Sequence, residues 1–155
     1  SASDISPSRG ENTEELTSQA TALVDSGRWK LWDNGKGLER QFRFKTFKAT
    51  WVCLVQHDTA ARKINIKILL SPLLPAQQDF MNAVAAECKK QKHHPEWTNV
   101  FNKTHIRWTT HNPEGLSRKD TEMARFCDEA GKQFGEAEPE DEVASCYGPG
   151  GKPTS

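Results

Sequence analysis

The chain has 155 residues, of which 35% are hydrophobic, and its 21 basic and 21 acidic side chains leave a formal net charge of zero. This balance gives no indication of a polyanionic partner, so we expect no direct contact with nucleic acid. The most apolar stretch, Ile64–Leu74, is interrupted by Pro72 and is too short to span a bilayer. We therefore expect no membrane partner.

Both ends of the chain are rich in Ser, Gly, Pro, Glu and Asp. We expect residues 1–12 and 136–155 to be disordered and a single domain to cover 13–135. A core of roughly 100 residues is only marginally stable alone, which favours oligomerisation. The four cysteines form no CxxC pair and match no zinc spacing, so we interpret them as reduced thiols in a cytoplasmic protein.

The first elements are a helix and a hairpin. Asn12 is a suitable N-cap for a helix over 13–26, which Gly27 would end. The segments 29–32 and 38–44 alternate apolar and polar residues around a glycine-rich turn, which predicts two antiparallel strands.

A second helix begins near Thr46, but its apolar stripe breaks at Val52 and resumes at Phe80. Deleting Val52–Gln78 restores steps of three and four residues throughout the stripe, as one amphipathic helix requires. Pro72 and Pro75 exclude a continuous helix through the segment itself.

A second hairpin is predicted over 97–101 and 104–110, with its turn at Asn102-Lys103, and a last helix is capped by Ser117. The order is helix, two strands, helix, two strands, helix. We therefore predict an α+β domain (α-β-β-α-β-β-α) in which a four-stranded antiparallel sheet carries its helices on one face.

The chemistry-bearing residues gather in the second half of the chain: His93, His94, His111 and Asp120. Imidazoles titrate near neutrality, so such a group suits acid/base catalysis. Metal binding is the alternative, but no HxxxH or HExxH spacing occurs and no cysteine joins the histidines at zinc spacing. Asp120 stands three residues after Ser117, and it could equally be a helix-capping residue. No motif indicates a serine or cysteine nucleophile.

These residues carry a family resemblance. The motif KKQKHHPEW over 89–97, the following hairpin, Thr110-His111 and the GLSRKD motif over 115–120 resemble pterin-4a-carbinolamine dehydratases, as do Gly27–Trp29 and Leu38–Lys45 upstream. The resemblance covers 16–134 apart from the interruption. It is specific, because it joins a His-His-Pro motif to a later His and Asp.

The resemblance implies a hydro-lyase that dehydrates 4a-hydroxytetrahydropterin to the quinonoid dihydropterin, in tetrahydrobiopterin recycling, without a metal or an organic cofactor. It implies that His93, His111 and Asp120 are catalytic and that His94, Pro95, Trp97 and Thr110 contact the pterin substrate. It also implies a homodimer or homotetramer. The alternative is a non-catalytic interaction module, because animal relatives stabilise dimers of a transcription factor; that role would add a nuclear location.

Two departures from the family stand out. Lys89 occupies a position where animal members carry an acidic residue, which puts one substrate contact in doubt. The larger departure is Val52–Gln78. It opens with Val-Cys and closes with Gln, whose codons can match the ends of many fungal introns, so we interpret it as a retained intron; a loop bulging from the helix is the alternative.

Overall fold

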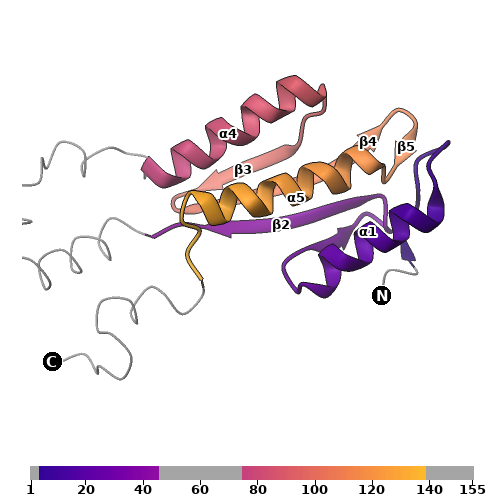
Figure 1. The fold of residues 1–155 in the computed structure, drawn as a ribbon, viewed down its shortest axis with the longest axis horizontal. Coiled ribbons are helices and arrows are strands. Elements are labelled where there is room, and N and C mark those ends of the chain that lie inside the picture. The colour runs from indigo at the N-terminus through magenta and orange to yellow at the C-terminus, as the bar shows by residue number, and fades with distance from the viewer. Residues whose placement is uncertain (1–3, 46–74, 139–155) are drawn as a thin grey trace, which may run out of the picture.

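A computed structural model of the chain describes residues 4–45 and 75–138. The described part contains three α-helices and an antiparallel sheet of four main strands (Figure 1). The helices are α1 (Thr13–Asp25), α4 (Pro75–Gln91) and α5 (Arg118–Gln133), and the strands are β1 (Lys30–Trp32), β2 (Gly37–Arg43), β3 (Glu96–Val100), β4 (Lys103–His111) and the two-residue β5 (Glu114–Gly115).

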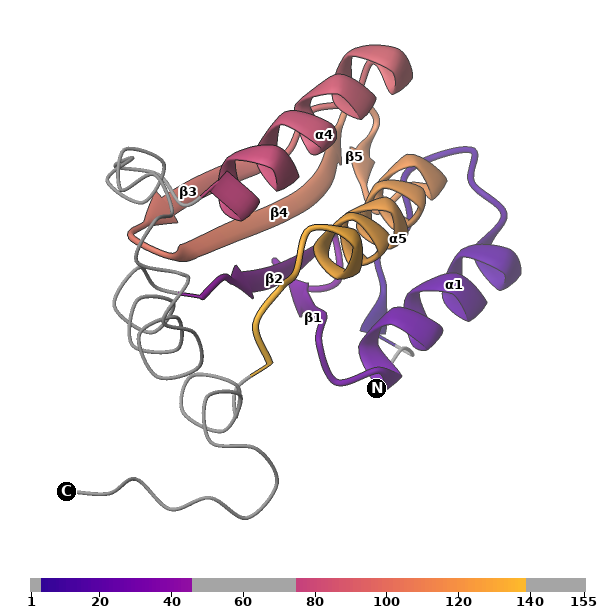
Figure 2. The same cartoon turned by 60° about the vertical axis from the view of Figure 1, so that its left-hand side comes forward.

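The sheet has the order β1-β2-β4-β3, and β5 pairs with the end of β4. All pairings are antiparallel, and β2 runs along β4 from Gly37 opposite Thr109 to Arg43 opposite Lys103. The three helices lie on the same face of this sheet in both views (Figures 1 and 2). The predicted fold class is confirmed.

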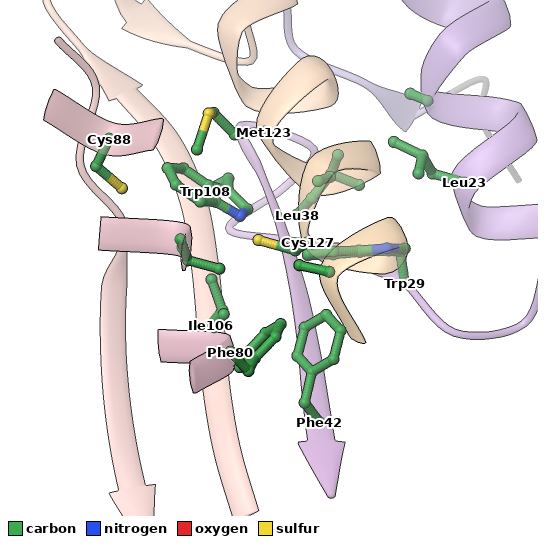
Figure 3. Close-up of a cluster of buried hydrophobic side chains, with 14 of the residues drawn as sticks. Leu23, Trp29, Leu38, Phe42, Phe80, Cys88, Ile106, Trp108, Met123 and Cys127 are labelled. Atoms are coloured by element: carbon green, nitrogen blue, oxygen red, sulfur yellow. The ribbon is translucent and has the colours of Figure 1, made fainter. Parts of the chain in front are cut away.

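Strand alternation separates a core face from a polar face. Leu38 and Phe42 of β2 and Ile106 and Trp108 of β4 are fully buried beneath the helices (Figure 3). On the opposite face, Glu39 of β2 contacts the side chains of His105 and Arg107 on β4. Successive strand residues point to opposite faces, so this pattern follows from the alternation in the sequence.

Helix α5 is held on β2 by a buried ion cluster as well as by apolar packing. Arg40, whose side chain is 3% exposed, pairs with Asp128 of α5 and with Glu136 just beyond it. Burial raises the pKa of the Glu136 carboxyl, and Arg40 opposes that shift. Because a buried charge without a partner is costly, the cluster fixes how α5 and the segment after it lie on the sheet.

The described parts of the two ends, where we expected disorder, make contacts with the rest of the domain. Ser6 and Ser8 exchange backbone hydrogen bonds with Leu116, and the Ser6 N–H also reaches the Gly35 carbonyl. Glu136 forms a bridge with Phe44, and Ala137 is buried. Composition missed these contacts because backbone groups pair whatever the side chains are. Residues 1–3 and 139–155 lie outside the described residues.

The β3–β4 turn differs in detail from the prediction. The left-handed residue is Phe101, with φ of 55°, whereas we expected Asn102-Lys103 to supply the turn. Asn102 is buried, and its side-chain N–H donates to the Phe44 carbonyl. Asn102 therefore stabilises the turn through this long-range side-chain hydrogen bond and not by adopting a left-handed backbone conformation.

Helix α4 begins inside Val52–Gln78, the segment that interrupts the family resemblance. Pro75 is its first residue, a position that requires no backbone N–H, so Pro75–Gln78 form its opening turn. Gln77 is fully buried; its Nε2 donates to Thr104 Oγ1, and its Oε1 has no partner among the described residues. The predicted helix start at Thr46 and most of Val52–Gln78 lie outside the described residues.

We propose that Val52–Gln78 is dispensable for folding. In a chain without it, the helix register places Thr50 where Gln77 now lies, and the unpaired amide oxygen is removed. An unsatisfied buried polar group costs about 1–3 kcal/mol, so the shortened chain should unfold at a higher temperature.

Thermal denaturation of the full and shortened chains tests this proposal. Gln77→Leu in the full chain is the matched control, because it removes the amide and leaves the segment in place; it should also raise the melting temperature. A shortened chain that melts at a lower temperature, or fails to fold, would show that the segment is structural.

Candidate active site

His93 lies two residues beyond the end of α4, and its backbone is fixed by the way that helix ends. Lys92 adopts a left-handed conformation, with φ of 52°. The His93 N–H then donates to the Cys88 carbonyl over 3.2 Å. A left-handed residue followed by this backward hydrogen bond is a Schellman-type helix end, although glycine is the usual residue at the position of Lys92.

Asp120 lies in the first turn of α5 and is fully buried. Its Oδ2 accepts the Ser117 backbone N–H at 2.9 Å and the Thr110 hydroxyl at 2.9 Å, and the Ser117 hydroxyl lies 3.2 Å from it. The N-terminal end of a helix also favours a negative charge. The capping role considered for Asp120 is therefore present in the structure.

The second oxygen of the same carboxylate faces His93. Asp120 Oδ1 lies 2.5 Å from His93 Nε2, and the His93 side chain is only 12% exposed. A carboxylate that accepts its other hydrogen bonds from an N–H and a hydroxyl is also an acceptor toward His93. We infer that Nε2 carries the hydrogen and that Nδ1 keeps its lone pair.

His111 lies next to Thr110 at the end of β4, but it points to the face of the sheet opposite the helices. It is exposed, and its Nε2 is 4.0 Å from Glu96 Oε1. Its neighbour Thr110 points to the helix side, where it reaches Asp120. The hydrogen bonds of the described residues therefore bring His93, Asp120 and Thr110 together and leave His111 outside that network.

Strand β4 extends beyond β3 near the two histidines. Strand β3 pairs with β4 only as far as Glu96 opposite Arg107, so the last four residues of β4 have no β3 neighbour. His93, His94 and Pro95 cross this gap as the chain passes from α4 into β3. Of these four residues, Trp108 and Thr109 are buried, Thr110 is half-buried and His111 is exposed, and β5 pairs with the last two.

The remaining predicted site residues are unequally exposed. His94 is exposed and Pro95 is half-buried. Trp97 faces the helices and packs against the hydrophobic core. Of these three, His94 is therefore the most accessible to a ligand.

Within residues 4–45 and 75–138, no group of three or more His, Cys, Asp or Glu side chains is placed to hold a metal ion. None of the helices in those two ranges is both long enough and apolar enough to cross a membrane.

The chain is similar to known proteins of one family. The family model described as "Pterin 4 alpha carbinolamine dehydratase" matches residues 73–130. A protein of Bordetella avium named "Putative pterin-4-alpha-carbinolamine dehydratase" is 46% identical over 114 residues, which are 74% of this chain and 81% of that protein. A protein of the same name from Novosphingobium aromaticivorans is 33% identical over 103 residues, 66% of this chain and 79% of that protein. The chain belongs to the pterin-4a-carbinolamine dehydratase family.

Among solved structures, the chain is similar to a transcriptional coactivator/pterin dehydratase from Brucella melitensis, with a TM-score of 0.48 and 23% identity. That match covers 74% of this chain and 94% of the other.

The buried thiols of this dehydratase-family chain are unsuited to nucleophilic chemistry. Burial raises the pKa of Cys127 far above its ordinary value and also raises the pKa of Cys88. Only a thiolate is a strong nucleophile, so both sulfurs stay protonated and serve as core side chains.

Two features of the site were not predicted from the sequence. The Trp108 ring stacks on the His93 imidazole, with centroids 5.6 Å apart and planes 23° apart. The Thr110 and Ser117 hydroxyls lie 2.6 Å apart beside Asp120. The spacing of Ser117 and Asp120 was the only signal for the second feature; we predicted Asp120 as a capping and catalytic residue, without the two hydroxyls beside it.

Proposed function

We propose that this chain is a hydro-lyase that dehydrates a 4a-hydroxytetrahydropterin to the quinonoid dihydropterin. The contact between His93 and the buried Asp120 carboxylate carries this proposal, together with membership of the family. The reduced, buried cysteines are compatible with the cytoplasm, where pterin recycling would occur.

The reaction requires two proton transfers and no redox step. The C4a–O bond breaks as its oxygen takes a proton and leaves as water. N5 loses its proton, and the electron pair of the former N5–H bond forms the new double bond between N5 and C4a. In our proposal His93 and His111 make these transfers, one imidazole giving a proton and the other taking one.

Asp120 supports this chemistry through His93. An imidazole bonded to a carboxylate through Nε2 keeps one tautomer, and the same carboxylate stabilises the imidazolium when Nδ1 becomes protonated. Because Asp120 is held by Ser117 and Thr110, His93 needs little reorganisation during the reaction. Thr110 therefore acts through Asp120 in this account, rather than as the substrate contact that the family resemblance implied.

The substrate would lie over the end of β4 that β3 does not cover. It could contact His93 from the helix side and His111 from the other side, because β3 ends before that point. His94 is exposed between them and would donate a hydrogen bond to the flat pterin ring. Pro95 and Trp97 would contact the pterin from the same side.

The experiment is the rate of carbinolamine dehydration, followed by absorbance, for single alanine variants of the histidines. We expect His93→Ala and His111→Ala each to lower kcat by about 10²–10⁴-fold, the usual contribution of an acid or base. His105→Ala is the matched control, because His105 lies on the same strand but contacts Glu39. It should keep the wild-type rate.

Folding of each variant is checked by circular dichroism. A wild-type chain that folds and binds pterin but does not accelerate dehydration would contradict the proposal. That result would favour the non-catalytic interaction module.

We also propose that the protein forms a homodimer or larger homo-oligomer. Strand β3 lies at one edge of the sheet, and the only large hydrophobic side chains with high exposure among the described residues stand at its end: Val100 at 69% and Phe101 at 74%. An exposed edge next to apolar side chains is a common site of strand pairing between copies.

Sedimentation of the wild type and of a Val100→Lys/Phe101→Lys double variant tests this proposal. The wild type should sediment as an oligomer and the double variant as a smaller species. Lys30→Glu at the opposite edge strand β1 is the control and should leave the oligomer intact. A monomeric wild type would contradict the proposal.

A further inference from the structure

The stacked pair of Trp108 and His93 has no part in the proton transfers described above. Trp108 stands on β4 with its side chain fully buried, and its ring lies nearly parallel to the imidazole at a centroid distance of 5.6 Å. The two rings come from different elements, because His93 follows α4. The contact therefore ties the imidazole to the sheet.

This contact restrains a motion that the other contacts of His93 leave free. The Cys88 carbonyl fixes the His93 backbone, and Asp120 fixes the direction of Nε2. Neither contact fixes the plane of the ring, which can still rotate about the line from its Cβ to Nε2. Stacking on an aromatic face fixes that plane, and with it the direction in which Nδ1 points.

Packing, rather than hydrogen bonding, holds Trp108 in place. Its indole lies among Cys88, Met123 and Cys127 (Figure 3). Its Nε1 has no hydrogen-bond partner among the described residues. A phenylalanine at this position would keep a stacking face and lose only the N–H group that neighbours the Cys127 thiol.

We propose that Trp108 is a positioning residue that sets the plane of the His93 imidazole so that Nδ1 faces the substrate. This inference rests on the proposed dehydration. It goes beyond that proposal in assigning a role to a buried core residue that does not touch the reacting atoms.

The test compares Trp108→Phe, which keeps an aromatic face, with Trp108→Leu, which fills part of the space but cannot stack. Misplacing a catalytic group by about 1 Å can cost about 10²-fold in rate. We expect Trp108→Leu to lower kcat by at least about tenfold with KM little changed, and Trp108→Phe to retain most of kcat.

Loss of core volume is controlled separately. Ile106→Ala opens a cavity on the same face of β4, two residues earlier, without removing the ring that stacks on His93. It should lower the melting temperature and leave kcat near the wild-type value. A loss of kcat in Ile106→Ala as large as that in Trp108→Leu would overturn the positioning role.

Nuclear magnetic resonance of the His93 ring protons gives a readout that does not depend on activity. In the wild type and Trp108→Phe, the facing ring should shift these protons upfield as one sharp set of signals. In Trp108→Leu the shift should disappear and the signals should broaden as the ring samples several orientations. Unchanged, sharp signals in Trp108→Leu would overturn the proposal.

The two readouts separate the two proposals. A wild type without dehydratase activity refutes the proposed function, and the ring signals still decide whether Trp108 orients His93.

Discussion

The arrangement of the site depends on one buried carboxylate with two tasks. Asp120 caps α5 through one oxygen and contacts His93 through the other. A fully buried carboxylate is costly unless its oxygens are hydrogen-bonded. Every group that satisfies Asp120 is therefore also constrained by it: the start of α5, the Thr110 hydroxyl at the end of β4, and the imidazole beyond α4. Folding and positioning of the site follow from the same contacts.

Because Asp120 contacts all three groups, the end of α4, the start of α5 and the end of β4 meet around its carboxylate. Helix α4 ends in a left-handed residue that turns the chain toward β3, while α5 begins where the β4–β5 hairpin returns. Strand β3 pairs with only part of β4, so the last four residues of β4 extend beyond it, near His93. The Trp108 ring of β4 stacks on the His93 imidazole at this end of the strand, the kind of rigid support that the proposed acid/base site would need.

Local patterns predicted those parts of the protein that local physics determines. The cap at Asn12, the stop at Gly27 and the strand alternation in 38–44 depend on neighbours in sequence, and the structure confirms them. Asn102 was misread as a left-handed turn residue, and the contact of Ser8 was missed. Their hydrogen-bond partners, Phe44 and Pro113 respectively, are far away in the chain. In the sequence, Trp108 cannot be told apart from other core residues, because its stacking on His93 depends on how α4 ends rather than on a motif.

The most direct test of this account is the tautomer of His93, measured by ¹⁵N nuclear magnetic resonance in the wild type and in Asp120→Asn, with His93→Ala to assign the signals. The account predicts that Nε2 carries the hydrogen in the neutral wild-type imidazole. In Asp120→Asn, the side-chain oxygen can still accept the Ser117 N–H, its NH₂ group faces His93, and the hydrogen should move to Nδ1. The same tautomer in both proteins, or a wild type protonated at Nδ1 alone, would contradict the account.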